Sequence, residues 1–247
     1  RYGGKILPKD VIENKWESVT NKDYGSGPFQ LQDYEVGNYY TFAANEDYYK
    51  TDSEGNQLPY ADKLTFNVEP DPVARVNSVK DERNDALNKI GATQYQTLKS
   101  ASGVDGRRRS GGGFYPIVLT NTIEPFDNPK VRKAIKYAVD KRKMTEGAFN
   151  GFGTMGRHHP ITKAHKYYPD LEDKFGVAAK PEKAKELLSE TEYAGGTTMP
   201  PLYAMPDNYS GHGAMSQLLQ QQLGEIGLEF EIKNITSDRW LSEYWNK

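Results

Sequence analysis

Groups of acidic side chains are the first candidates for chemistry in this sequence. Asp170, Glu172 and Asp173 lie close together, as do Glu190 and Glu192. Two carboxyl groups about 5 to 10 Å apart can hydrolyse a glycosidic bond. Because the chain carries 34 Asp and Glu residues, such groups also arise by chance and ordinarily lie on solvated surface. A carbohydrate-active hydrolase stays as an alternative, but we predict that the chain is not an enzyme.

Two other patterns are candidates for a metal ion or a nucleotide. His158 and His159 are adjacent, yet neighbouring histidines of a strand point to opposite faces, and no carboxylates nearby complete a ligand set. Residues 151–156 (GFGTMG) match a G-x-G-x-x-G phosphate loop, which needs a strand before it and a helix after it. Here a predicted helix precedes the glycines and HHP follows. We therefore predict a plain loop, no metal site and no cofactor.

Composition excludes further classes of protein. The 247 residues contain no cysteine, so disulfide frameworks, zinc ribbons and thiol nucleophiles are absent. The formal net charge is −2, and the arginine triplet at 107–109 belongs to no longer basic stripe, so we predict no nucleic-acid partner. No apolar run approaches the ~18 residues that cross a bilayer. The sequence also lacks a G-x-S-x-G elbow for a serine nucleophile.

The elements that would position a site are mainly strands and turns in the first hundred residues. Apolar and polar residues alternate at 29–32 and at 64–69, which predicts half-buried strands. Asp71 followed by Pro72 is typical of a helix start, and the spacing predicts a helix from Pro72 to about Asp81. Residues 100–113 are rich in glycine and arginine, which predicts a surface loop or a connection between two lobes. We place a domain boundary near Gly112.

Helices and strands alternate in the second half of the chain. The sequence predicts a short buried strand at 117–119, helices that begin at Pro129 and Pro181, a helix over 215–226 that stops at Gly227, and a strand at 228–233. Such alternation indicates an α/β lobe with some parallel pairing.

Several segments resemble, in a fixed order, those of one known family. In the first half they are GSGPF (25–29), YEVG (34–37), NEDYY (45–49), PYADKLTF (59–66) and PDPVARV (70–76). In the second half they are NT (121–122), PFDN (125–128), VRKAI (131–135), YAVDK (137–141), PEKAKELL (181–188) and QLGEIGL (222–228). Together they resemble the extracellular solute-binding proteins of family 5, the peptide and nickel receptors of ABC importers.

The resemblance implies an α/β fold of the type II periplasmic-binding-protein kind, with two lobes that contain mixed sheets. Residues 1–112 would be part of the strand-rich first lobe and residues 113–247 most of the second, both incomplete in this chain. We therefore expect an internal piece of a longer protein, which by itself binds its solute weakly or not at all.

The function that the resemblance implies is the substrate-binding component of an ABC importer. Such a protein captures an oligopeptide or similar small solute outside the cytoplasmic membrane and delivers it to permease subunits. The implied location is extracytoplasmic, in the periplasm or on the cell surface as a lipoprotein, with membrane association only through a lipid anchor or the permease, outside this segment. Receptors of the same fold for a sugar, nickel or haem remain alternatives.

Ligand-contacting residues are expected where α/β lobes usually meet ligands, at strand-end loops. Tyrosine outnumbers phenylalanine 17 to 9, and tyrosine suits half-wet contact surfaces. We predict that the ligand contacts Phe114 and Tyr115 at the lobe crossing, Tyr203 and Tyr209 near a predicted strand end, and Trp240.

Overall fold

The chain divides into two compact units, Arg1–Arg75 and Val76–Lys247. The structure, a computed structural model, describes residues 9–14, 25–88, 90–108, 111–206 and 210–245. Within these ranges no helix is both long and apolar enough to cross a bilayer. The predicted lobe boundary near Gly112 stays a prediction.

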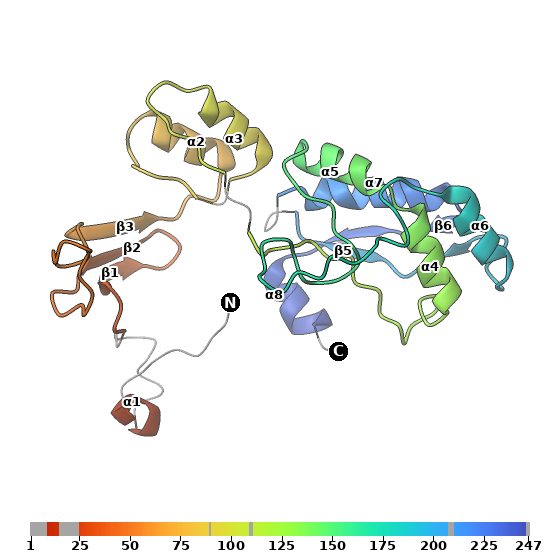
Figure 1. Cartoon of the computed structure of the whole chain (residues 1–247), viewed down its shortest axis with the longest axis horizontal. Helices are drawn as coiled ribbons and strands as arrows, with labels where there is room; N and C mark the ends of the chain where they lie inside the picture. The colour runs from red at the N-terminus through yellow and green to blue at the C-terminus, as the bar shows by residue number, and fades with distance from the viewer. Residues whose placement is uncertain (1–8, 15–24, 89, 109–110, 207–209, 246–247) are drawn as a thin grey trace. The chain divides into compact units, whose positions relative to one another are not determined.

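A three-stranded antiparallel sheet forms the first unit, with β2 in the centre (Figure 1). Its strands are β1 (Phe29–Glu35), β2 (Tyr39–Ala44) and β3 (Lys63–Asn67), preceded by the short helix α1 (Lys9–Asn14). Leu31 pairs with Phe42, which pairs with Leu64, so apolar residues of all three strands share one face. The strands predicted at 29–32 and 64–69 are confirmed, but β3 is exposed along its whole length, so the half-buried face expected there is wrong.

Helix α2 (Pro72–Lys80) starts at the predicted residue. The carboxylate of Asp71 accepts hydrogen bonds from the backbone N–H groups of Val73, at 2.9 Å, and Ala74, at 2.7 Å, and so caps the first turn. Helix α3 (Ala92–Lys99) follows. The sequence does not predict α3, because a single side chain, that of Leu98, is buried along it.

Four further helices and two pairs of parallel strands form most of the second unit. The helices are α4 (Pro129–Ala138), α5 (Lys141–Phe149), α6 (Pro181–Ser189) and α7 (His212–Gly224). Strand β4 (Thr197–Thr198) pairs with β6 (Leu228–Glu229), and β5 (Leu202–Ala204) pairs with β7 (Ile232–Asn234). Helix α8 (Ser237–Arg239) and the π-helix η2 (Trp240–Tyr244) come last. In Figure 1, α4 lies beside α6 and α5 beside α7.

The hydrophobic core of the second unit lies between these helices and the short strands. The predicted face of α4 is buried, and Asn128 caps that helix by accepting a hydrogen bond from the backbone N–H of Lys130 at 2.9 Å. The other helices and the strands contribute further buried side chains, which are Met144, Ala184, Leu188, Leu219, Leu223, Leu228 and Phe230. The helices predicted from Pro129 and Pro181, and the one that precedes Gly227, are therefore confirmed.

The predicted strand at 228–233 is broken into β6 and β7. Met199 donates its backbone N–H to the carbonyl of Glu229, and Leu202 donates to that of Glu231. Between these donors stand Pro200 and Pro201, which have no N–H to give. The ladder is interrupted there, so one alternating pattern becomes two short strands.

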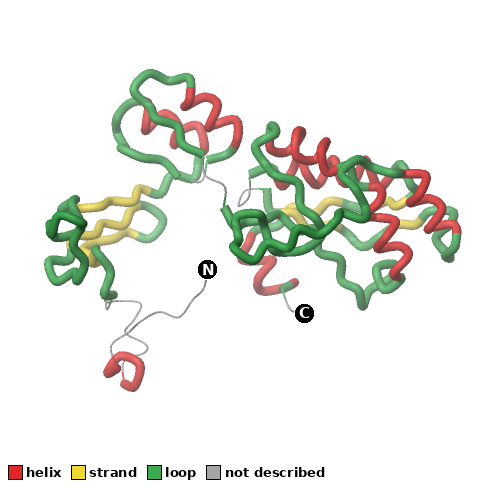
Figure 2. Tube along the Cα trace, in the orientation of Figure 1, coloured by secondary structure: helices red, strands yellow, loops and turns green. Residues whose placement is uncertain are grey.

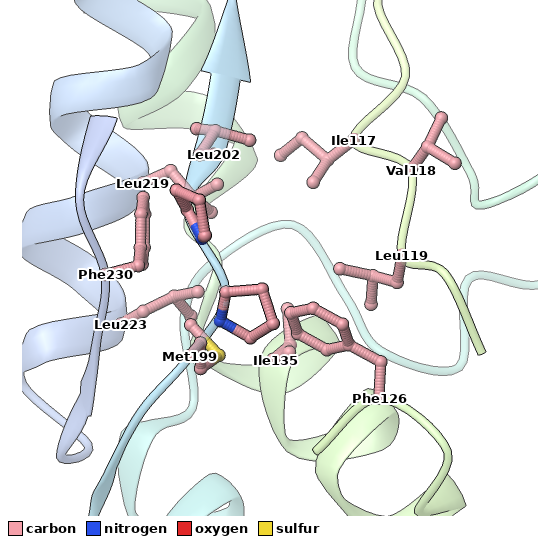
Figure 3. A pocket seen from close by; sticks show the side chains of 12 residues that line it. Ile117, Val118, Leu119, Phe126, Ile135, Met199, Leu202, Leu219, Leu223 and Phe230 are labelled. Carbon is pink, nitrogen blue, oxygen red and sulfur yellow. The ribbon is translucent and has the colours of Figure 1, made fainter. Parts of the chain in front are cut away.

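The predicted strand at 117–119 is wrong. The segment has no strand in the structure, and although Ile117 and Leu119 pack against the core, the side chain of Val118 is 71% exposed. In Figure 3 the segment lies across an apolar cavity from Leu202 of β5. A short apolar run can bury alternate side chains against helices without pairing to a neighbouring strand.

Two glycines allow β4 and β6 to start side by side. The φ angles of Gly196 and Gly227 are +90° and +81°, in the left-handed region that favours glycine. A Cβ atom on Gly196 would lie 2.7 Å from the carbonyl oxygen of Gly227, which accepts a hydrogen bond from Thr197.

A nearly buried ion pair ties the long loop between α5 and α6, green in Figure 2, to α5. Lys141 Nζ lies 2.5 Å from Asp173 Oδ2, and the two side chains are 11% and 13% exposed. The other oxygen of Asp173 accepts the backbone N–H groups of Phe175 and Gly176. Burial acts against ionisation, but the hydrogen bond and charge of Lys141 outweigh it and hold the pKa of Asp173 below its usual value.

We predict that Gly196→Ala lowers the free energy of unfolding by about 2 to 3 kcal/mol, from left-handed strain and the contact with Gly227. Gly195→Ala is the matched control, because a Cβ there meets nothing within 4 Å, and it should change stability by less than about 0.5 kcal/mol. Urea unfolding followed by circular dichroism measures both variants. Equal losses of stability in the two variants would contradict the close contact between Gly196 and Gly227.

Asp173→Ala should lower the free energy of unfolding at pH 7 by about 2 to 4 kcal/mol, because it leaves Lys141 without its counter-charge in a nearly buried place. The folded-state pKa of Asp173 is depressed, so its contribution is present above the ordinary carboxyl pKa and is lost as the pH falls through the folded-state value. The difference between wild type and variant should therefore shrink in acid.

The control for this substitution is Asp170→Ala, which breaks the ion pair between Asp170 and Arg157. The side chain of Asp170 is 85% exposed. It should cost less than about 1 kcal/mol. Urea unfolding at pH 7 and at about pH 3 measures both variants. A loss at Asp173 that stays constant down to the lower pH would show that its charge is not responsible.

Candidate functional site

The structure describes four of the five predicted ligand-contacting residues and leaves Tyr209 outside the described ranges. Phe114 and Tyr115 lie between α3 and α4, with exposed fractions of 51% and 44%. Tyr203 is the middle residue of β5, and Trp240 is the first of η2. Phe114 and Tyr115 therefore expose large aromatic surfaces, whereas Tyr203 and Trp240 are half-buried.

Tyr203 and Trp240 belong to a terminal aromatic cluster, which also contains Tyr244 and Trp245. The ring centroids of Tyr203 and Tyr244 are 4.1 Å apart, and those of Trp240 and Trp245 are 4.6 Å apart. A hydrogen bond with Tyr203 is the main reason that the pKa of Tyr244 is raised. Because η2 follows β7 and Tyr203 lies on β5, the parallel pairing of these strands brings the residues together.

Tyr115 belongs to a different group, the α5–α7 aromatic cluster, with Phe149 and His212. Its ring centroid lies 5.1 Å from that of Phe149, the last residue of α5, and 5.0 Å from that of His212, the first of α7. Gly211 makes room here, because a Cβ on it would lie 2.5 Å from the Phe149 ring. Burial lowers the pKa of His212, so its imidazole is neutral at pH 7.

Sequence reasoning missed Phe149 and His212. Phe149 stands at a helix end just before Asn150, which adopts a left-handed conformation, and His212 follows a left-handed glycine. These signals mark helix ends but do not show that the two ends meet. Arg107 and Arg108 of the arginine triplet are exposed, and the Arg108 guanidinium lies 5.3 Å from the centre of the Phe152 ring, which in turn meets Tyr95.

Two cavities lie in the described part of the second unit. The first, of about 60 Å³, has apolar walls that include Ile117, Phe126, Met199 and Leu219 (Figure 3). It offers no polar side chain and is a gap in the core. The second has a volume of about 310 Å³ and is lined by Gly112, Pro160, Ile161, Thr162, Ala164 and His165.

Three of the five acidic side chains considered for catalysis form ion pairs with lysine or arginine. Asp173 pairs with Lys141, Asp170 with Arg157 at 2.8 Å, and Glu190 with Lys130 at 2.7 Å. The hydrogen bond from Lys130 holds the pKa of Glu190 below its usual value. A general acid of a glycosidase needs the opposite shift, which neither Asp173 nor Glu190 shows.

His158 and His159 lie in the loop between α5 and α6, as do the glycines of 151–156, so the predicted loop is confirmed. Burial, followed by the charge of Lys141, lowers the pKa of His158 to about 4. Its Nε2 atom lies 3.9 Å from Asp173, whose oxygens already serve Lys141 and the backbone. In the described part of the chain, no group of three or more His, Asp or Glu residues is arranged to hold a metal ion.

The chain is similar in sequence to bacterial proteins that are named for the solutes they bind. The "Heme-binding protein A" of Haemophilus influenzae is 29% identical over 195 residues, which is 79% of this chain and 34% of that protein. The "Di/tripeptide-binding protein 3" of Pseudomonas aeruginosa is 27% identical over 235 residues, which is 94% of this chain and 42% of that protein. The chain thus spans less than half the length of these relatives.

Solved structures confirm the predicted fold class. An ABC-transporter-associated periplasmic binding protein from Helicobacter pylori, in complex with the peptide STSA, matches with a TM-score of 0.74 and 19% identity, over 96% of this chain and 44% of that chain. The family model described as "Bacterial extracellular solute-binding proteins, family 5 Middle" matches residues 4–247. The chain therefore belongs to the bacterial extracellular solute-binding proteins of family 5.

Proposed function

We propose that this chain is part of the substrate-binding component of an ABC importer, which captures an oligopeptide or similar small solute outside the membrane and delivers it to permease subunits. Family membership supports this, as does the 27% identity to a protein named for binding di- and tripeptides. The extracytoplasmic location, as a periplasmic protein or an anchored lipoprotein, is part of the same proposal. So is the division into lobes near residue 112.

The observation that carries the proposal is the presence of aromatic side chains on β5 and on the segment that follows β7. Ligands of α/β folds bind at the carboxyl ends of strands. Faces of Tyr203, Tyr115 and Trp240 supply apolar contact area, and tyrosine hydroxyls add hydrogen bonds at the ring edge. Such groups suit the side chains and amides of a peptide, and they perform no bond-breaking step. Phe114 and Tyr209 remain proposed contacts.

The ligand class can be tested by calorimetry on the complete polypeptide that carries this chain. We expect micromolar or tighter binding to some members of a library of di-, tri- and oligopeptides, and no binding to haem, Ni²⁺ or oligosaccharides. Absence of peptide binding would contradict the peptide preference, and tight haem binding would favour the corresponding alternative. Turnover of an oligosaccharide that disappears with one Asp or Glu substitution would overturn the non-enzymatic assignment.

The contribution of the terminal aromatic cluster can be tested with Tyr203→Ala. Truncation of a half-buried aromatic contact should weaken peptide affinity by about tenfold, or 1.4 kcal/mol. Tyr203→Phe keeps the ring and should retain affinity within about threefold.

Tyr49→Ala is the matched control, since Tyr49 is 74% exposed and belongs to neither cluster. Circular dichroism verifies that each variant is folded. If Tyr203→Ala bound peptide as tightly as Tyr49→Ala, the terminal aromatic cluster would be a packing feature of the lobe instead of a ligand contact.

A further inference from the structure

One side of the sheet in the first unit is apolar and aromatic. It is made by side chains that directly oppose one another across β1, β2 and β3 (Figure 1). They are Leu31, Phe42 and Leu64 in one row and Tyr34, Tyr40 and Phe66 in another. Residues two apart along a strand point to the same side of a sheet, so both rows belong to one surface. We call this surface the apolar sheet face.

The rings of the apolar sheet face pack on one another and are nevertheless open to solvent. Tyr34 stacks on Tyr40 with ring centroids 6.0 Å apart, and Phe42 meets Phe66 edge to face at 5.8 Å. The exposed fractions of Tyr34, Phe66 and Leu64 are 41%, 49% and 37%. A contiguous apolar patch of this kind marks a place where another surface binds.

The opposite side of the sheet is polar, and its hydrogen bonds are made within the sheet. The hydroxyl oxygens of Thr41 and Thr65 lie 3.3 Å apart, and the hydroxyl of Tyr39 donates to Asp33 at 2.8 Å. Thr41 is the single buried residue of the three strands, so no apolar side chain of the sheet is fully buried. A sheet gains its stability by packing a hydrophobic face against another element. The apolar sheet face therefore needs a cover.

The length of the relatives favours a cover that belongs to the same polypeptide. The chain spans 34% and 42% of two curated relatives, so more than half of each relative lies outside the matched part. A sheet that depends on its cover for stability needs that cover at all times. A covalently joined segment meets this need, because the linkage gives it an effective concentration on the order of millimolar. A separate partner would have to be present at its own concentration in solution.

The size and charge of the apolar sheet face define what fits it. Three strands about 4.8 Å apart, each with five or more residues that rise about 3.4 Å, give a surface of roughly 14 by 17 Å. This is room for about three turns of one helix. None of the residues on the face carries a charge, so a charged group buried against it would have no partner there.

We infer that the apolar sheet face is the docking surface for an uncharged, apolar segment of the same polypeptide that lies outside these 247 residues. That segment supplies the buried apolar area that the first unit lacks, and the sheet is a structural joint instead of a ligand contact. The inference goes beyond the proposed function, because it holds whichever solute the complete protein binds.

Photo-crosslinking in the complete polypeptide tests this docking surface. Phe66→p-benzoylphenylalanine places a photoreactive ring on the apolar sheet face, and mass spectrometry identifies the residue to which the ring couples. We expect an intramolecular cross-link to a residue outside the 247. Tyr49→p-benzoylphenylalanine is the matched control, since Tyr49 is 74% exposed and lies outside the strands. With few atoms in contact, the control should give at least about tenfold less cross-linked product.

Every other pattern of cross-links would overturn the inference. Coupling from position 66 at the level of position 49 would show that the face stays in solvent. A cross-link between two polypeptides that disappears on dilution would identify a second copy as the cover. Coupling within the 247 residues would show that the chain covers its own sheet, and coupling to an added peptide would make the face a ligand surface.

Two charged substitutions provide a second measurement on the complete polypeptide. Phe66→Asp places a carboxylate under the cover and should lower the melting temperature by about 5 to 10 °C. Thr65→Asp is the matched control, because Thr65 is also exposed but lies on the polar side, and it should lower the melting temperature by less than about 2 °C. Equal shifts would contradict a cover. If Phe66→Asp does not fold, the cross-link from position 66 gives the answer.

Discussion

Parallel pairing of β5 with β7 is the constraint on which the candidate site depends. The register joins Leu202 to Ile232 and Ala204 to Asn234, and the backbone N–H of Ile235 extends it by donating to Ala204. Because the two strands are parallel, their carboxyl ends lie at the same end of the pair. One leads to His212 at the start of α7, and the other to Trp240 and Tyr244 on η2. The segment after β7 brings Tyr244 against Tyr203 of β5, so two distant segments of the chain supply the terminal aromatic cluster.

Helix α7 packs against β5 and β7 and joins them to the rest of the second unit. The side chain of Gln220 donates to the carbonyl of Phe230 at 2.6 Å, and buried Gln222 accepts the backbone N–H of Asp140 at 2.8 Å. The first bond fixes α7 to the segment between β6 and β7, and the second fixes it to the junction of α4 and α5. The end of α5, where Phe149 meets Tyr115, is therefore positioned by the helix whose first residue is His212.

Local signals in the sequence determine the parts of the fold that were predictable. Asp71 and Asn128 cap helices through hydrogen bonds within the next few residues, and alternation in β1 and β3 reflects a register set by neighbouring strands. Predictions failed where the outcome depends on another segment. The break at Phe230 follows from prolines on the opposing strand, and residues 117–119 have an apolar pattern without a strand partner. The meeting of Phe149 with His212, like the cavity around Thr162, follows from tertiary packing that spacing cannot encode.

The partners of three acidic side chains argue against catalysis. Asp170, Asp173 and Glu190, three of the five acids that suggested catalysis, each have a basic partner, and the pKa values of Asp173 and Glu190 are lowered. A hydrolase needs a carboxyl group kept protonated by its surroundings, which these ion pairs oppose.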